Sequence, residues 1–217
     1  MSTKTRIVLL MHPMEWKREK CTTGRLACLN LADSEIIPGL AFDANPRFRA
    51  LADDPHNYAM LLYPGKDALD LSALPFPPSL LAPATGSPSE AGGSRVERRL
   101  VVFLIDATWA CAKSVARESP GLMTLPRLMF TPREKSRWII KRQPADWCLS
   151  TLEAIHELLI ALDRVGLDVY PDPERLLKVF AGMQEYQVAR RDAGGHARHL
   201  DRLASRSADP LSPSNRA

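Results

Sequence analysis

Three short runs of apolar residues predict buried β-strands. They cover residues 6–11, 58–63 and 100–105, and each is nearly continuous in apolar side chains and closes at a polar residue or a helix breaker. Apolar runs of this length are typical of strands that are covered on both faces in a parallel sheet. We therefore expect a mostly parallel sheet flanked by helices, which is the α/β class of fold.

The segments between and after these strands predict helices. We expect helices around residues 24–31, over 109–117, over 150–165, and from Pro173 to about Arg191. The third is the clearest, because its leucine and isoleucine side chains recur at helical spacing. Ser150 followed three residues later by Glu153 is typical of a capping box at its first turn.

Two segments hold few residues that could pack into a core. Residues 76–98 are rich in proline, glycine and serine, so we expect a flexible insertion there and not a domain boundary. Residues 201–217 predict a disordered tail. The remaining chain, residues 1–200, is then a single domain, and 217 residues with 45% hydrophobic side chains suffice for one core.

Several classes of protein are excluded at this stage. No apolar run approaches the ~20 residues of a membrane helix, and the N-terminal residues lack a signal-peptide cleavage site. We therefore expect a soluble, cytoplasmic protein with no membrane partner. The four cysteines occur at none of the spacings typical of a zinc site, so we expect reduced thiols and no metal.

Positive charge is concentrated in one segment, although the net charge is only +4. Between Arg127 and Arg142 lie six basic residues and the single acid Glu134. This excess suits a nucleic-acid backbone, but it is equally typical of a solvated basic face. Phe130 and Trp138 lie within the segment and could stack on bases. The candidate RNA-binding residues are His12, Arg18, Arg25, Arg133, Lys141 and Arg142.

Asp106 is the strongest candidate for chemistry. It follows a predicted buried strand, and the carboxyl ends of such strands are where α/β sheets place ligands. Thr108 can cap the helix that begins there, and the backbone N–H groups of this helix start would face the same crevice. The alternative is that Asp106 itself caps the helix while Trp109 fills the core.

Three other candidate segments lie where a predicted strand ends or a predicted helix begins. Residues 148–154 begin a capped helix. The backbone N–H groups of its first turn could bind a polar group of a ligand, or the segment could be only a well-capped start of a core helix. Residues 12–26 follow the first strand, and their Thr23-Gly24 pair predicts a turn suited to an anion. There His12, Arg18 and Arg25 could contact phosphate or only loop and solvent. Residues 61–65 end the second strand in a proline-glycine turn.

Taken together, these segments resemble the DTW-domain family. Asp106, Thr108 and Trp109 match its Asp-x-Thr-Trp signature, with HPMEWKREKCTTGRL and LLYPG before it and STLEA after it, in the family's order. The resemblance implies a fold akin to the SPOUT class, with a C-terminal trefoil knot that binds S-adenosylmethionine. It further implies a tRNA-uridine aminocarboxypropyltransferase, which modifies uridine N3 in tRNA and releases methylthioadenosine.

The same resemblance assigns residues to the site. Asp106 matches the catalytic acidic position, as the acceptor of the N3 proton or as a ligand of the cofactor's amino group. Leu62, Pro64 and Trp109 match a hydrophobic wall around the sulfonium methyl, so that the methionine-side methylene is the carbon exposed to attack. The full implied set of cofactor-binding residues is Thr23, Leu62, Pro64, Asp106, Trp109, Leu128, Cys148, Leu149 and Ser150.

Two other functions remain consistent with these residues. One is an RNA methyltransferase with the same fold and cofactor, which would release adenosylhomocysteine. The other is a non-catalytic RNA-binding factor, which need not bind S-adenosylmethionine. Many bacterial DTW proteins carry an N-terminal cysteine-rich, zinc-type segment, whereas this sequence starts directly at the first strand. We expect this difference to affect how tRNA is anchored and not the core chemistry.

Overall fold

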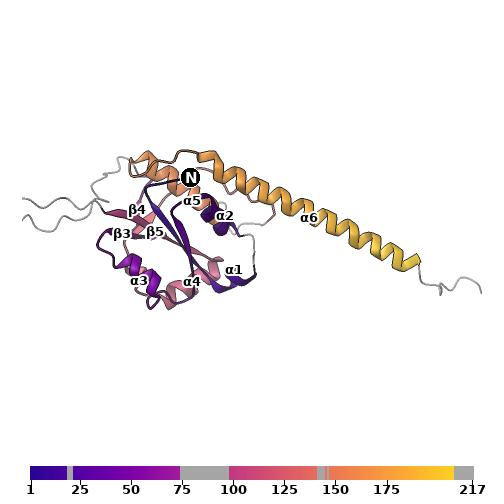
Figure 1. Cartoon of the computed structure of the whole chain (residues 1–217), viewed down its shortest axis with the longest axis horizontal. Helices are drawn as coiled ribbons and strands as arrows, with labels where there is room; N and C mark the ends of the chain where they lie inside the picture. The colour runs from indigo at the N-terminus through magenta and orange to yellow at the C-terminus, as the bar shows by residue number, and fades with distance from the viewer. Residues whose placement is uncertain (19–21, 74–97, 141–144, 146, 208–217) are drawn as a thin grey trace, which may run out of the picture.

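A parallel β-sheet forms the centre of the molecule (Figure 1). The computed structural model describes residues 1–18, 22–73, 98–140, 145 and 147–207. Within these residues the sheet has six strands in the order β2-β1-β5-β3-β6-β4, and all pairs are parallel. The strands are β1 (Arg6–Met11), β2 (Ser34–Pro38), β3 (Asn57–Leu62), β4 (Leu69–Asp70), β5 (Arg99–Asp106) and β6 (Arg127–Met129).

The three predicted strands are confirmed as β1, β3 and β5, with ends that differ by at most one residue. Their continuous apolar sequence has a direct cause, because both faces of each strand are covered. Ile7 and Leu9 of β1 belong to one hydrophobic cluster, while Val8 and Leu10 belong to another on the opposite face. Alternate side chains therefore enter two separate cores.

Helices cover both faces of the sheet (Figure 1). On one face lie α2 (Thr23–Asn30), α5 (Thr151–Arg164) and α6 (Pro173–Ser207). On the other lie α3 (Pro46–Ala52), α4 (Trp109–Glu118) and the short 3-10 helix η2 (Leu122–Thr124). One short helix, α1 (Pro13–Arg18), directly follows β1. The α/β class is thus confirmed, and α6 continues well past its predicted end near Arg191.

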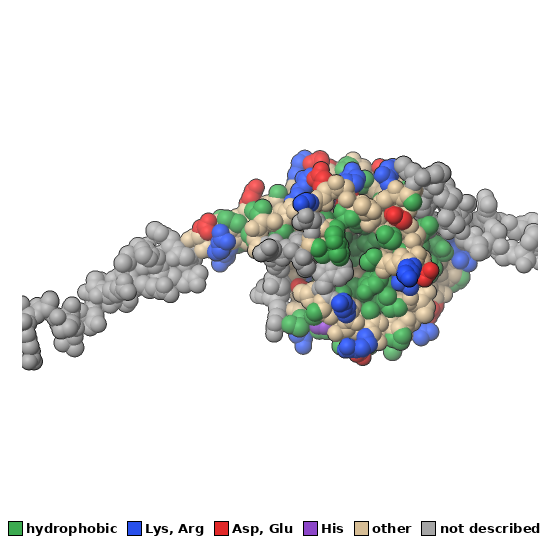
Figure 2. Space-filling view, turned by 180° about the vertical axis from the view of Figure 1, so that it is seen from behind, with side chains coloured by type: hydrophobic (Ala, Val, Ile, Leu, Met, Phe, Trp, Pro, Cys, Tyr) green, Lys and Arg blue, Asp and Glu red, His purple; other side chains and the backbone are tan. Residues whose placement is uncertain are grey.

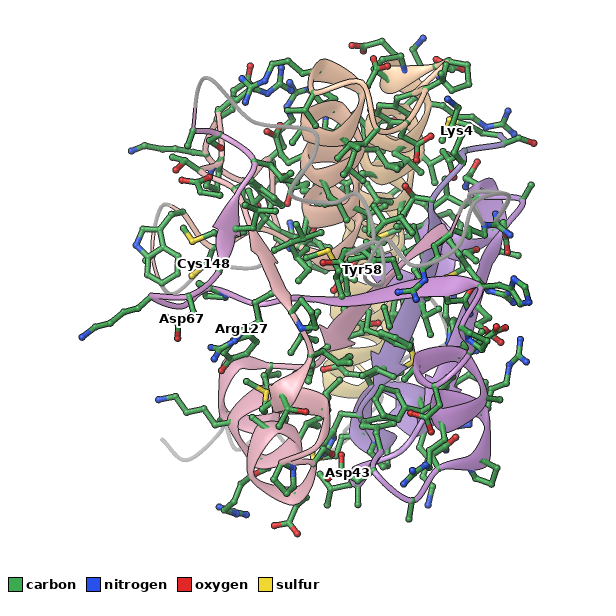
Figure 3. The ribbon with its side chains drawn as sticks, turned by 90° about the vertical axis from the view of Figure 1, so that its left-hand side faces the viewer. Lys4, Asp43, Tyr58, Asp67, Arg127 and Cys148 are labelled. Carbon is green, nitrogen blue, oxygen red and sulfur yellow. The ribbon has the colours of Figure 1, made fainter. Side chains whose placement is uncertain are left out.

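The strand order contains a feature that the sequence did not predict. Strands β3 and β4 follow each other closely in the chain, yet β6 lies between them and pairs with both. The loop from β3 to β4 therefore spans β6, and a Cβ on its Gly65 would lie 2.6 Å from the guanidinium of Arg127 at the start of β6. Asp67 of this loop and Arg127 are labelled in Figure 3.

Two predictions concern residues that the structure does not describe. The insertion expected over 76–98 lies outside the described residues except for its last position, and so do the last ten residues of the tail expected over 201–217. Residues 201–207 lie in α6, while the insertion and the tail over 208–217 stay predictions. In the part of the chain that is described, no helix is long and apolar enough to cross a membrane.

Candidate functional site

Asp106 lies at the point of the sheet where the direction of the strand order reverses. Its strand β5 is adjacent to β1, but the chain leaves β1 toward β2 at one edge and leaves β5 toward β6 on the other side. Ligand crevices of α/β sheets occur at such points. The backbone joins the two strand ends, because the N–H of His12 donates to the carbonyl oxygen of Asp106 at 3.1 Å.

The carboxylate of Asp106 is buried, with 6% of the residue exposed. Its Oδ1 accepts a hydrogen bond of 2.6 Å from the hydroxyl of Thr151, in the first turn of α5. On another side it meets Gly24 in α2, where an added Cβ would lie 2.9 Å from both the Asp106 Cγ and the Leu9 Cδ1. Only a glycine lets α2 approach the carboxylate this closely.

Three helices begin around this carboxylate, and each has a side-chain cap. The hydroxyls of Thr22, Thr108 and Ser150 accept from backbone N–H groups in the first turns of α2, α4 and α5. Because Thr108 caps α4, the alternative interpretation of Asp106 as that cap is wrong. Helix N-termini carry partial positive charge, so this arrangement favours an anionic group among them.

A cavity of about 390 Å³ lies beside this carboxylate, at the carboxyl ends of β3, β5 and β6. That volume falls in the range of small-molecule sites. Its walls are mostly apolar, and its few polar side chains include Thr131 and Thr151. Since Thr151 also donates to Asp106, one hydroxyl connects the buried carboxylate with the cavity. Figure 2 shows hydrophobic side chains gathered around a recess on the side opposite to the view of Figure 1.

The structure brings four of the predicted cofactor-binding residues together in the cavity wall. They are Leu62, Pro64, Leu128 and Leu149. Thr23 is not among the residues that form the wall and lies next to Gly24 in the first turn of α2. Asp106 is not among the residues of the wall, but its carboxylate accepts a hydrogen bond from Thr151, which is. The side chain of Trp109 lies outside the described part of the structure.

The segment that leads into α5 alternates between the interior and the cavity. Cys148 and Ser150 are buried, whereas Trp147, Leu149 and Thr151 line the cavity. Side chains of an extended segment point alternately to opposite sides. The predicted residues Cys148 and Ser150 therefore point inward, and their chain neighbours face the cavity. Cys148 is labelled in Figure 3. Sequence reasoning missed Trp147 and Thr151, although this period of two was the available signal.

Three predicted RNA-binding residues already have intramolecular partners. The Nδ1 of His12 accepts from the N–H of Met14 at 3.2 Å. The guanidinium of Arg25 lies 4.1 Å from the ring centre of Trp16 and donates to its carbonyl oxygen. Arg133 makes two hydrogen bonds of 3.0 Å to Glu157. The other three, the side chain of Arg18 together with Lys141 and Arg142, lie outside the described residues.

Part of the basic segment is attached to the helices by a buried carboxylate. Glu153 accepts from the N–H of Ser150, which completes the predicted capping box, and also from the Ser136 hydroxyl and the Arg137 N–H. Next to it, the Trp138 ring packs edge-on against Phe180 of α6, with centroids 4.9 Å apart. Trp138 therefore has a packing role, and its stacking on a base stays a prediction.

Two side chains with a shifted pKa lie outside the cavity wall. Burial raises the pKa of the Cys28 thiol to about 11, so the thiol is protonated and unreactive at neutral pH. Burial lowers the pKa of His156, whose Nδ1 lies 3.2 Å from the Tyr170 hydroxyl. Among the described residues, no group of three His, Cys, Asp or Glu side chains could hold a metal ion.

Comparisons with known proteins agree on one family. The DTW domain family model matches residues 1–188. The tRNA-uridine aminocarboxypropyltransferase 2 of Drosophila melanogaster is 31% identical over 167 residues, which cover 75% of this chain and 58% of that protein. The Mus musculus protein of the same name is 26% identical over 162 residues, covering 74% of this chain and 48% of the relative.

The chain thus spans about half the length of the curated relatives that it matches. No solved structure matches it. The family model extends over the whole sheet, the cavity and most of the packed part of α6. The chain belongs to the DTW-domain family.

Proposed function

We propose that this protein transfers the 3-amino-3-carboxypropyl group of S-adenosylmethionine to N3 of a uridine in tRNA. Two relatives bear the name of this activity, although each extends beyond the matched region. The observation that carries the proposal is the cavity at the carboxyl ends of the strands, connected with the buried Asp106 by a single hydroxyl.

The cavity has the volume of a small-molecule site, and its apolar wall suits the adenosyl and sulfonium-methyl parts of S-adenosylmethionine. Leu62 and Pro64 would form the apolar surface around the sulfonium methyl, which prevents attack on that carbon. Leu128 and Leu149 would contact the adenine side. The bound molecule supplies a carbon that is already activated by its sulfonium, so the protein has to position the nucleophile and accept one proton.

Asp106 is the proposed final acceptor of the uridine N3 proton. Because Thr151 donates its hydroxyl proton to Asp106 and also lines the cavity, it can receive the N3 proton as it passes its own to the carboxylate. Before the transfer, the three helix N-termini around Asp106 stabilise the negative charge of its carboxylate. A base within hydrogen-bond reach, directly or through one bridging hydroxyl, meets the geometric requirement for general base catalysis.

The path of the chain around β6 supports a further part of the proposal, the trefoil knot in the C-terminal region. The loop between β3 and β4 passes from one side of β6 to the other, an arrangement in which the chain that enters and leaves β6 could be threaded through this connection. Continuous electron density from β3 through α6 in a crystal structure would test it.

The first experiment identifies the product. Purified protein is incubated with S-adenosylmethionine and tRNA, and the released nucleoside is identified by mass spectrometry. Methylthioadenosine is the expected product. Adenosylhomocysteine would replace the proposal by methyl transfer, and a protein that binds no S-adenosylmethionine would replace it by a non-catalytic RNA-binding role.

The second experiment tests Asp106. Asp106→Asn should lower single-turnover transfer by about 10²–10⁴-fold and leave the affinity for S-adenosylmethionine nearly unchanged. Asp43→Asn is the matched control, because its carboxylate accepts from the N–H groups of Gly121 and Leu122, away from the cavity wall. If Asp106→Asn instead lowers the affinity for S-adenosylmethionine, Asp106 holds the cofactor's amino group. Normal turnover with normal binding would refute both roles.

A further inference from the structure

Trp147 is an exposed tryptophan on the wall of the cavity. The residue is 62% exposed and contributes to the cavity lining. The backbone beside it is held in place, because Cys148 is buried and its N–H donates to the carbonyl oxygen of Ala145 at 3.0 Å. Tryptophan usually buries most of its large apolar surface. An indole on an anchored backbone, at a cavity wall and with most of its area in solvent, is therefore a surface suited to a ligand.

Two other aromatic residues line the cavity and are less exposed. Tyr63 and Phe130 are only partly exposed, and each packs against a hydrophobic core cluster. Within the described residues, Trp147 is thus the large aromatic side chain that combines a place on the cavity wall with high exposure.

The proposed reaction requires such a surface. The cavity would be filled by S-adenosylmethionine, so the nucleophilic base has to be presented from outside. A base that leaves its stack in RNA loses stacking energy, and proteins commonly compensate for this loss with an aromatic side chain. Resting on the proposed function, we propose that Trp147 is a positioning residue whose indole stacks on the target uridine.

Stacking on Trp147 and the polar contacts at Thr151 have separate tasks. An indole stacks on any base, because every base has a π-face, so Trp147 does not select uridine. Thr151 lies four residues further along the same segment and also lines the cavity. Trp147 would hold the plane of the base, and Thr151 would meet the edge that carries the N3 proton.

The test compares three variants. Trp147→Ala removes the ring, Trp147→Phe keeps an aromatic face, and Ile139→Ala is the control. Ile139 is 71% exposed and lies in the same connection between β6 and α5, but it is not part of the cavity wall. Thermal unfolding of each variant checks that the fold is intact. The measurements are the affinity for tRNA, the KM for tRNA, kcat, and the affinity for S-adenosylmethionine by calorimetry.

Trp147→Ala should weaken tRNA binding and raise the KM for tRNA by about 5- to 150-fold, the effect of losing one base–aromatic stack. The affinity for S-adenosylmethionine should stay the same. Trp147→Phe should restore most of the loss, and Ile139→Ala should behave as wild type. An unchanged KM in Trp147→Ala, an equal loss in the Phe variant, or a matching loss of S-adenosylmethionine affinity would each overturn the proposal.

A fluorescence titration separates this proposal from the transfer reaction itself. A short uridine-containing single-stranded RNA is added to wild type and to Trp147→Phe in the presence of S-adenosylmethionine. The chain has four tryptophans, so the difference between the two titrations isolates Trp147. Quenching that is lost in Trp147→Phe shows stacking even if no aminocarboxypropyl product forms. Product formation by wild type without any quenching of Trp147 would refute the stacking while leaving the proposed function intact.

Discussion

Gly24 offers the sharpest test of the arrangement around Asp106. It lies in α2, where a change from glycine to alanine normally favours the helix by about 1 kcal/mol. At this position, however, an added Cβ would lie 2.9 Å from the Asp106 Cγ and from the Leu9 Cδ1. Leu9 is fully buried, and Asp106 is held by the hydroxyl of Thr151. Neither neighbour can move away without loss of contacts.

The expected cost follows from those two neighbours. Overpacking a core by one methyl group costs about 1–3 kcal/mol. Displacing the carboxylate also weakens its hydrogen bond to Thr151, and a hydrogen bond to a charged group contributes about 1.5–3 kcal/mol. After the helix-propensity gain is subtracted, Gly24→Ala should lower the free energy of unfolding by about 1.5–5 kcal/mol. Transfer activity should fall as well, because the displaced carboxylate is the proposed proton acceptor.

Urea unfolding gives the free energy of each variant, and the same chain provides a matched control. Gly182 lies in α6, and an added Cβ there would meet nothing within 4 Å. Gly182→Ala should therefore stabilise the protein by about 0.5–1 kcal/mol. If Gly24→Ala stabilises it by a similar amount, α2 does not approach Asp106, and the reasoning about this site is refuted.

Two further predictions concern pH and salt. Burial lowers the pKa of His156, so the unfolded chain binds the proton more tightly, and the free energy of unfolding should fall as the pH drops below the unfolded value of about 6.5. Urea unfolding at pH 7.5 and 5.5 should show a smaller difference in His156→Gln, and an unchanged difference would contradict this cause. Replacing both Lys141 and Arg142 with glutamine should weaken tRNA binding and reduce the slope of log affinity against log salt by about two units. Unaltered RNA affinity at low salt would place the RNA surface elsewhere.

Local sequence was sufficient wherever the structure is determined by neighbours along the chain. The three strands were predicted because their continuous apolar runs reflect cover on both faces of the sheet. The start of α5 was predicted because a capping box needs only Ser150 and Glu153. By contrast, α3 was missed although Asn45 caps it and Pro46 occupies its first turn. The capping signals were present in the sequence. The helix is only seven residues long, which is too short for a clear helical periodicity of apolar residues.

The candidate site divides in the same way. The DTW motif and the strand ends identified Asp106 from the sequence, because a strand followed by a capped helix is a local pattern. Its contact with Thr151 joins residues 45 positions apart, and the pairing of Arg133 with Glu157 joins residues 24 apart. The pairing of Arg133 with Glu157 offsets much of the charge that Arg133 appeared to offer to RNA.

Long-range packing also decided the strand order and the roles of the aromatic residues. Nothing in the short segment 127–129 indicates that it pairs between β3 and β4. Trp138 and Trp147 lie nine positions apart in one connecting segment, yet α6 covers the first through Phe180, while the second is exposed at the cavity. Hydrophobicity and periodicity report how a residue relates to its chain neighbours. Which distant surface covers it depends on how the helices pack on the sheet, and that is decided only in the tertiary structure.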